Sequence, residues 1–350
     1  MDFRSIIAFA IEKNASDIHL VVGYNPAIRV TGKLFYMHDM GILTAMDTAS
    51  LPKLLLSAAQ QQFFNENKEI DFSYAYEDTR FRVNMYVARG SCAASLRLIP
   101  SLIRTTKELN LPDIFESFTN YKQGLILFTG PTGEGKSTSL AAIINKLNYQ
   151  DARHIITIED PIEFVYPQAR AVISQRELLH DTLSWSGALK SVLREDPDVL
   201  LVGEMRDYDT IQSVLTIAET GHLVFSTLHT GSATESINRI IDVFPAYQQS
   251  QVRSSLAGSL IAVVAQRLLP TADGTGRIPA VEILFNKIAV SSLIREGKTF
   301  QLDNVIETSE SEDMILFEKY LAQLYTQGKI TRETAYTYAL RKNLVQKLIR

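Results

Sequence analysis

The stretch Gly130-Pro131-Thr132-Gly133-Glu134-Gly135-Lys136-Ser137 decides the fold class, because it matches the pattern G-x-x-x-x-G-K-[S/T]. It follows the continuous apolar run Leu125–Phe128 and precedes a helical pattern over 139–147. A buried strand, a glycine loop and a helix in this order form a phosphate-binding loop. The glycines let the backbone wrap closely around phosphates, and the helix N-terminus favours negative charge. The sequence therefore predicts a P-loop nucleotide-binding domain.

Two residues at the end of this loop have separate predicted roles. We expect Lys136 to reach the β- and γ-phosphates of ATP and the Ser137 hydroxyl to bind Mg²⁺. ATP and Mg²⁺ are thus the predicted cofactors. The predicted nucleotide-binding residues are Gly130, Pro131, Thr132, Gly133, Glu134, Gly135, Lys136, Ser137 and Thr138.

Short apolar runs continue the pattern of strand and helix after the loop. They lie at 155–158, 199–202 and 223–225 and are separated by helical patterns, one of which has Ser184 as a suitable N-cap. Strands that alternate with helices are typical of an α/β domain with a mostly parallel sheet. Beyond Pro270 the pattern predicts mainly helix.

The first hundred residues have a different organisation. Amphipathic helix is mixed with alternating polar and apolar runs such as 16–20 and 80–85, which is typical of half-buried strands. Pro100 and Pro112 disfavour regular structure around them. We therefore expect a smaller α+β domain at 1–99, a linker at 100–113, and an ATPase domain with a helical C-terminal part at 114–350.

Composition restricts the partners and the compartment. The 350 residues include 35 Lys and Arg and 39 Asp and Glu, a formal net charge of −4, which argues against nucleic acid as the main partner. Cys92 is the only cysteine, so a disulfide framework and a four-cysteine zinc site are excluded. Apolar stretches such as Leu260–Ala265 fall far short of the ~20 residues that a membrane span needs. We expect a cytoplasmic protein.

Acidic residues follow two of the predicted strands. Glu204 comes just after the strand at 199–202 and is better placed than Asp198, which precedes it, to hold Mg²⁺. The segment Thr157–Glu163 carries three further carboxylates after the strand at 155–158. A hydrolase needs one acid to orient or deprotonate the attacking water, and the spacing leaves open which of the three does so.

Histidines and arginines supply further candidates. His222 and His229 bracket the strand near 223–225, where an imidazole could donate to a γ-phosphate oxygen or simply hold a structural hydrogen bond. In the N-terminal part, a group of arginines is either solvated or supplies arginine fingers to a neighbouring subunit. These are Arg80, Arg82, Arg89 and Arg97.

Four ordered motifs resemble those of the secretion-ATPase superfamily. They are GPTGEGKST at 130–138, TIEDPIEF at 157–164, LREDPDVLLVGEMRD at 193–207 and GHLVFSTLHT at 221–230. Within that superfamily the chain most resembles the type IV pilus retraction (twitching-motility) ATPases, to which the segments 15–19 and 292–298 are also similar.

The resemblance implies a hexameric ring in the cytoplasm, with a PAS-like N-terminal domain and a RecA-like ATPase domain. Such a motor hydrolyses ATP to power pilus retraction and twitching motility. It would lie at the inner membrane beneath the pilus machine, with an inner-membrane platform protein as partner and a sister retraction ATPase as a further partner. Carried over by position, the remaining site residues are the catalytic carboxylate Glu163, the Walker B acid and metal-binding residue Glu204, the histidine-box pair His222 and His229, and the phosphate-contacting arginines Arg82 and Arg97.

Two positions depart from the family pattern. Glu134 stands where the family commonly has serine, and a carboxylate directed at the phosphates would weaken ATP binding. We therefore expect the Glu134 side chain to point to solvent. Gly231 stands where the family usually has a larger polar residue, which affects the expected stiffness of that loop.

Three other functions fit the motifs less well. A pilus-extension or type II secretion ATPase usually carries a longer N-terminal region and a four-cysteine zinc insertion. An accessory retraction ATPase that assists a sister motor is opposed by the intact Lys136, Glu163 and Glu204. A DNA translocase would need a basic, aromatic-lined channel, which the net charge disfavours.

Overall fold

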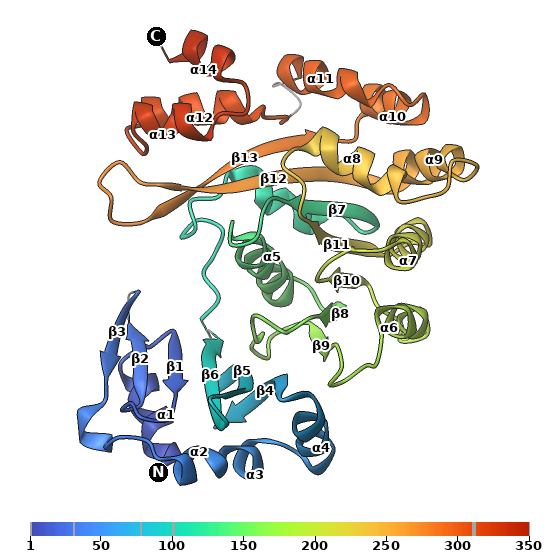
Figure 1. Cartoon of the computed structure of the whole chain (residues 1–350). Helices are drawn as coiled ribbons and strands as arrows, with labels where there is room; N and C mark the ends of the chain where they lie inside the picture. The colour runs from blue at the N-terminus through green and yellow to red at the C-terminus, as the bar shows by residue number, and fades with distance from the viewer. Residues whose placement is uncertain (1, 31, 78, 100–101, 310–312, 350) are drawn as a thin grey trace. The chain divides into compact units, whose positions relative to one another are not determined.

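The computed structural model describes residues 2–30, 32–77, 79–99, 102–309 and 313–349 (Figure 1). The chain divides into two compact units. Unit 1 is Met1–Leu102 with Glu163–Val165, and unit 2 is Ile103–Ile162 with Tyr166–Arg350. Residues 100 and 101 of the predicted linker lie outside the described residues. From Ile103 onward the remainder of that segment belongs to unit 2, where Ile103, Thr106 and Leu111 are buried.

Unit 1 is an α+β unit built on a six-stranded antiparallel sheet among the described residues, in the order β3-β2-β1-β6-β5-β4. Alternation sets its faces, because Phe81, Val83 and Met85 of β5 are fully buried while Arg82 between them is exposed. The strands are β1 Asp17–Leu20, β2 Ala27–Val30, β3 Lys33–Tyr36, β4 Glu69–Tyr76, β5 Thr79–Ala88 and β6 Ser91–Ile99. The helices are α1 Phe3–Glu12, α2 Ala45–Ala49, α3 Leu51–Leu55 and α4 Ala58–Asn67, with a 3₁₀ turn, η1, at His38–Met40.

Unit 2 confirms the predicted α/β fold with a mostly parallel sheet. Its described strands follow the order β13-β12-β7-β11-β10-β8-β9, and the pairings from β12 through to β9 are parallel. Fully buried strands such as β7 explain the continuous apolar runs in the sequence. The strands are β7 Gly124–Thr129, β8 His154–Glu159, β9 Val172–Glu177, β10 Val199–Val202, β11 Leu223–Leu228, β12 Leu260–Pro270 and β13 Arg277–Phe285.

The described chain beyond Pro270 is mainly helical, as expected, but the sequence analysis missed one strand there, β13. This strand pairs antiparallel with β12 from Ala262–Phe285 to Pro270–Arg277, and eight of its nine residues are buried. A strand buried on both faces lacks the alternation of polar and apolar residues that distinguishes a strand from a buried helix. Helices do follow it: α10 to α14 lie beyond the β12–β13 hairpin in Figure 1.

The helices of unit 2 cover the sheet and its hairpin. Before the hairpin these are η2 Asp113–Asn120, α5 Lys136–Gln150, α6 Trp185–Val192 (capped by Ser184, as predicted), α7 Tyr208–Glu219, α8 Ala233–Asp242 and α9 Gln249–Ser259. After it come α10 Ile288–Arg295, η3 Thr299–Gln301, α11 Leu302–Thr308, α12 Phe317–Thr326, α13 Arg332–Tyr338 and α14 Lys342–Leu348.

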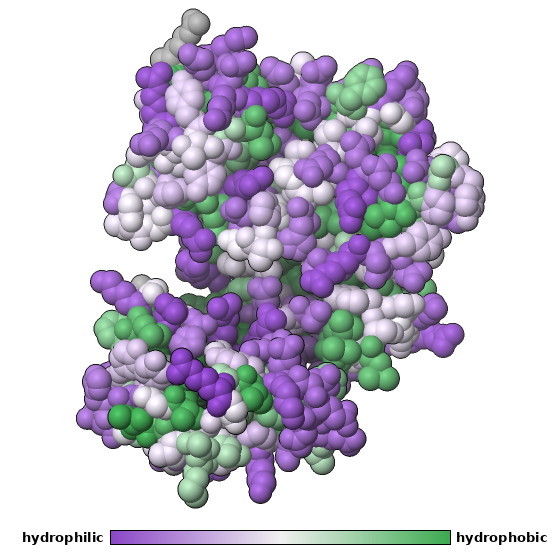
Figure 2. Space-filling view, in the orientation of Figure 1, coloured by the Kyte–Doolittle hydropathy of each residue, from purple (hydrophilic) through white to green (hydrophobic). Residues whose placement is uncertain are grey.

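Hydrophilic residues dominate the visible surface of both units. Figure 2 shows hydrophobic side chains there only in scattered groups. Among the described residues, none of the helices combines the length and the apolar character required to cross a bilayer.

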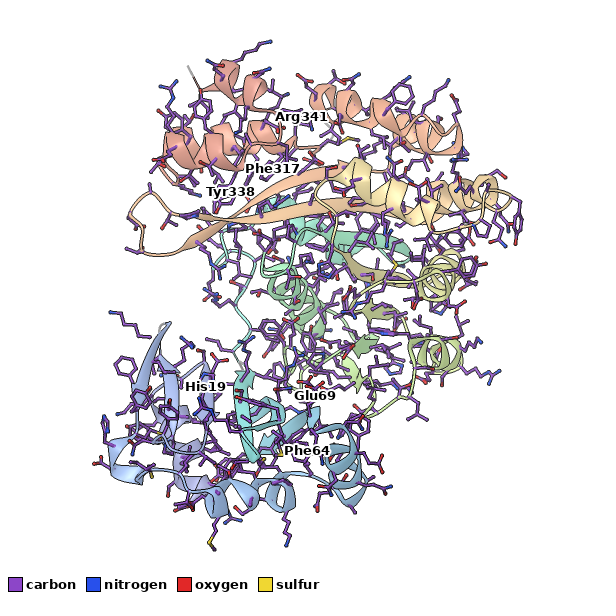
Figure 3. The ribbon with its side chains drawn as sticks, viewed as in Figure 1. His19, Phe64, Glu69, Phe317, Tyr338 and Arg341 are labelled. Carbon is purple, nitrogen blue, oxygen red and sulfur yellow. The ribbon has the colours of Figure 1, made fainter. Side chains whose placement is uncertain are left out.

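Buried carboxylates tie the C-terminal helices to β13. Glu282 of β13 is 1% exposed, and its Oε1 accepts the N–H of Ala233, the first residue of α8, at 2.9 Å. The Arg341 guanidinium, labelled in Figure 3 beside α14, lies 3.7 Å from Glu282, 3.5 Å from the buried Glu318 and 3.4 Å from Asp303. Three carboxylates therefore share one guanidinium in a largely buried site.

This cluster predicts a pH-dependent stability. Burial raises the pKa of Glu282 to about 7, so the folded protein keeps a proton that the unfolded chain releases near pH 4.5. The contribution of Glu282 to the free energy of unfolding therefore falls as pH rises from about 4.5 to 7, by about 3 kcal/mol. In Glu282→Gln, which still accepts from Ala233, we expect a flatter urea-unfolding profile between pH 5 and 8. The exposed Glu219→Gln is the control, and parallel profiles for all three proteins would contradict the assignment.

Candidate nucleotide site

The P-loop, residues 130–137, has the backbone that its glycines predict. Gly130 has φ 140° and Gly135, the N-cap of α5, has φ 79°, both in the region that favours glycine. A Cβ on Gly130 would lie 2.3 Å from the carbonyl oxygen of Gln266 on β12. The loop therefore packs directly on a neighbouring strand, and its geometry requires glycine.

Lys136 folds back into this loop. Its side chain is buried, and Nζ donates to the carbonyl oxygens of Gly130 at 2.6 Å and Pro131 at 3.0 Å. The ammonium is thus held among oxygen acceptors at the N-terminus of α5, where phosphate oxygens would be stabilised. The loop fits a nucleotide phosphate chain.

The structure corrects the expected orientation of Glu134. Its Oε2 accepts the backbone N–H of Leu268 on β12 at 2.5 Å, and its own carbonyl accepts from Gln266 Nε2 at 2.7 Å. The Glu134 side chain does not project into solvent, because the Leu268 N–H on β12 lies within its reach and donates to it. The carboxylate is turned onto the strand.

His229 joins the P-loop to the acid after β10. Because β7, β11 and β10 are adjacent parallel strands, the residues after them meet at one sheet edge. His229 Nε2 donates to Glu204 Oε1 at 3.2 Å, and the hydroxyl of Thr132 lies 3.4 Å from His229 Nδ1. Three motifs that are separate in the sequence thus form one cluster.

Glu204 also binds Arg206, whose Nε donates to Oε1 at 2.7 Å. Burial raises the pKa of Glu204, but the hydrogen bonds and positive charges of Arg206 and His229 outweigh it, so the pKa lies below its ordinary value. The carboxylate is therefore ionised at neutral pH, the form that attracts Mg²⁺ or its bound waters.

No group of three or more His, Cys, Asp or Glu side chains able to hold a metal occurs within the described ranges. Ser137 is the second residue of α5, and Glu204 follows β10 at the same sheet edge. One hydroxyl and one carboxylate suit Mg²⁺, which in nucleotide sites takes most of its oxygens from phosphates and water.

His222 lies apart from this cluster. It precedes β11, whereas His229 follows it, so the strand of roughly 20 Å separates the two histidines. His222 Nδ1 donates to the carbonyl of Ile217 at the end of α7 at 3.1 Å. Within one subunit only His229 of the two histidines contacts the P-loop among the described residues, and the roles of both remain predictions.

The predicted arginines are cross-strand neighbours in unit 1. Arg82 of β5 lies opposite Arg97 of β6, and Arg97 lies opposite Asp17 of β1, to whose Oδ1 its Nε donates at 2.9 Å. Burial raises the pKa of Asp17, but hydrogen bonds from Ser16 and Arg97 outweigh it and hold the pKa below its usual value. The ionised Asp17 offsets the repulsion between the two arginines.

Glu163 belongs to the segment Glu163–Val165, which groups with unit 1. Of the two carboxylates that the same motif places in unit 2, Glu159 is buried and accepts from Thr157 Oγ1 at 2.7 Å. The roles of Glu163, Arg82 and Arg97 remain predictions.

Sequence reasoning missed Gln266 and Arg206. Gln266 is buried, donates to the Glu134 carbonyl and accepts from Ser139 Oγ at 2.8 Å. Nothing in the local pattern of β12 signals this, because its partners lie about 130 residues earlier. Arg206, in contrast, stands two residues after the acid that it binds and could have been proposed from that spacing.

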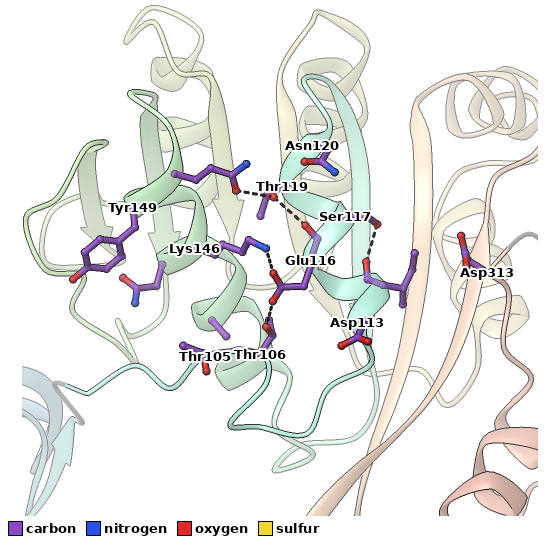
Figure 4. A pocket seen from close by; sticks show the side chains of 14 residues that line it. Thr105, Thr106, Asp113, Glu116, Ser117, Thr119, Asn120, Lys146, Tyr149 and Asp313 are labelled. Atoms are coloured by element: carbon purple, nitrogen blue, oxygen red, sulfur yellow. Dashed lines mark hydrogen bonds and ion pairs between the residues drawn. The ribbon is translucent and has the colours of Figure 1, made fainter.

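A separate pocket of about 1010 Å³ lies at the other end of α5 (Figure 4). Glu116 of η2 contacts both Thr106 and Lys146 there, which fastens the segment after Ile103 to α5. None of the predicted nucleotide-site residues is among those that line it. The pocket is therefore distinct from the P-loop site.

Comparison with known proteins gives concordant results. The family model described as Type II/IV secretion system protein matches residues 2–284. The chain is 44% identical to the type IV pilus retractation ATPase PilT of Pseudomonas aeruginosa over 96% of this chain and 97% of that protein. It is 46% identical to a twitching motility protein of Neisseria gonorrhoeae over 89% and 83% of the two chains. A crystal structure of the pilus retraction motor PilT with bound ADP superposes with a TM-score of 0.93 at 43% identity, covering 99% of both chains.

Proposed function

This chain belongs to the type II/IV secretion system protein family, and we propose that it is an ATPase motor that drives retraction of a type IV pilus. The observation that carries the proposal is the cluster of Thr132 of the P-loop, His229 and Glu204 at one edge of the parallel sheet. Similarity to retraction and twitching proteins along nearly the whole chain supports the pilus as the object of the motor.

The site residues divide the work of ATP hydrolysis. Lys136 would bind the β- and γ-phosphates, and the ionised Glu204 with the Ser137 hydroxyl would hold Mg²⁺, which would supply positive charge to the phosphates. His229 donates to Glu204 and lies beside Thr132 of the P-loop, so it is placed to respond when the γ-phosphate leaves. Glu163 is the proposed carboxylate that orients the attacking water.

The active form is proposed to be a homo-hexameric ring. Arg82 and Arg97 lie in unit 1, which lacks the P-loop, and an arginine supplied by another subunit would stabilise charge in the transition state. The ring would act in the cytoplasm on a platform protein at the inner membrane, with a sister ATPase as a further partner.

A fibre count in the bacterium that encodes this chain tests the proposal. Deleting the gene is expected to leave excess surface pili, visible by electron microscopy, and to abolish twitching on agar, because extension continues without retraction. Complementation with the wild-type gene restores both. Bald cells would instead identify an extension motor, and an unchanged fibre count would overturn the role of principal retraction motor.

A further inference from the structure

One edge of β12 pairs with β7 for only the first part of the strand, whereas the other edge pairs with β13 to the end. Its pairing with β7 ends at Ala265, opposite Thr129, while its pairing with β13 continues to Pro270. Beyond Ala265 the edge that faces β7 therefore has backbone groups with no strand to bind. In a folded protein such groups are satisfied by another partner.

The P-loop supplies that partner through one residue. Glu134 Oε2 accepts the N–H of Leu268, and the Glu134 carbonyl accepts from the Gln266 side chain. Gln266 is in turn fixed by Ser139 of α5. Glu134 is thus held at its backbone and at its carboxylate, and both bonds lead to β12.

The fit around these bonds is tight. A Cβ on Gly135, the next residue, would lie 3.1 Å from Gln266 Nε2 and 3.3 Å from Leu268 Cδ1. The loop between β7 and α5 is therefore packed closely against β12 at Glu134 and Gly135, while Thr132 of the same loop contacts His229.

We propose that Glu134 is a positioning residue for the nucleotide: its carboxylate fastens the P-loop to β12 and turns its own charge away from the phosphates. This inference rests on nucleotide binding by the P-loop. Fastening fixes the loop backbone before ADP or ATP arrives, so less conformational entropy is lost on binding. A serine side chain at this position is too short to reach the Leu268 N–H, so this hydrogen bond requires the longer glutamate side chain.

Two substitutions separate fastening from charge. Glu134→Gln removes the charge but keeps an oxygen that accepts from Leu268, whereas Glu134→Ala removes both. We expect the Gln variant to bind ADP with an affinity within about threefold of wild type. The Ala variant should bind ADP about tenfold more weakly, because it loses one hydrogen bond to a charged acceptor. The KM for ATP should rise in parallel, with kcat within about twofold, because the bond is present before and during the reaction.

Hydrogen exchange of the Leu268 amide in the nucleotide-free protein gives a readout that does not require ligand. The Leu268 amide is expected to be protected from exchange in wild type and in Glu134→Gln. In Glu134→Ala and Glu134→Ser it should exchange at least tenfold faster. Equal or tighter ADP binding in the Ala variant, or unchanged Leu268 exchange, would overturn the proposal. Failure of wild type to bind ADP would overturn the proposed function instead, and the exchange result would still stand.

Discussion

Lys136→Ala is expected to abolish tight nucleotide binding, with the affinity for ADP and ATP falling about 100-fold and ATP hydrolysis becoming undetectable. The Lys136 ammonium is buried among the loop carbonyls at the N-terminus of α5. Alanine removes the only charge that this position offers to the β- and γ-phosphates. Calorimetric titration with ADP and a phosphate-release assay measure both effects.

The control for this variant is Lys190→Ala, an exposed lysine on α6 whose loss should leave binding and stability unchanged. Unaltered ADP affinity in Lys136→Ala would remove this residue from the phosphate site.

Mixing the Lys136→Ala variant with wild-type protein tests whether the subunits of the proposed ring depend on one another. Loss of activity beyond the fraction of variant subunits indicates sites that depend on neighbours, and strictly proportional loss contradicts that dependence.

Glu204→Gln is expected to keep nucleotide binding within about threefold of wild type while hydrolysis falls about 100- to 1000-fold. Glutamine still accepts from Arg206, so the local structure is retained, but the negative charge that attracts Mg²⁺ and its waters is gone. Single-turnover hydrolysis of bound ATP measures the chemical step separately from binding.

Glu219→Gln, an exposed acid at the end of α7, serves as the matched control and should hydrolyse ATP at the wild-type rate. Hydrolysis by Glu204→Gln at the wild-type rate would show that another group holds the metal. Equal losses of binding and hydrolysis would point to a structural role for the Glu204–His229–Arg206 contacts.

Local patterns in the sequence predict the parts of the fold and site that local physics determines. The glycine loop, the apolar strands around it and the acid after β10 could all be identified, because their geometry follows from neighbouring residues. The convergence of the P-loop, Glu204 and His229 also follows, since parallel neighbouring strands end at one sheet edge.

The sequence could not predict contacts that depend on distant pairing. The Leu268 N–H can donate to Glu134 because the pairing of β12 with β7 ends at Ala265, and no pattern near Glu134 contains that information. β13 was missed because burial on both faces removes the alternation that identifies a strand. In unit 1 the pattern predicted strands, but the opposition of Arg97 to Asp17 depends on a register that local residues do not encode.

The β12–β13 hairpin reaches the nucleotide site from two directions. Gln266 and Leu268 of β12 hold the P-loop, while Glu282 of β13 binds the start of α8, a few residues after His229. The two strands are paired along nine positions, so both sets of contacts belong to one continuous hairpin. One hairpin therefore contacts the P-loop through β12 and, through Glu282 and Arg341, the C-terminal helices, so a continuous series of contacts joins the two regions.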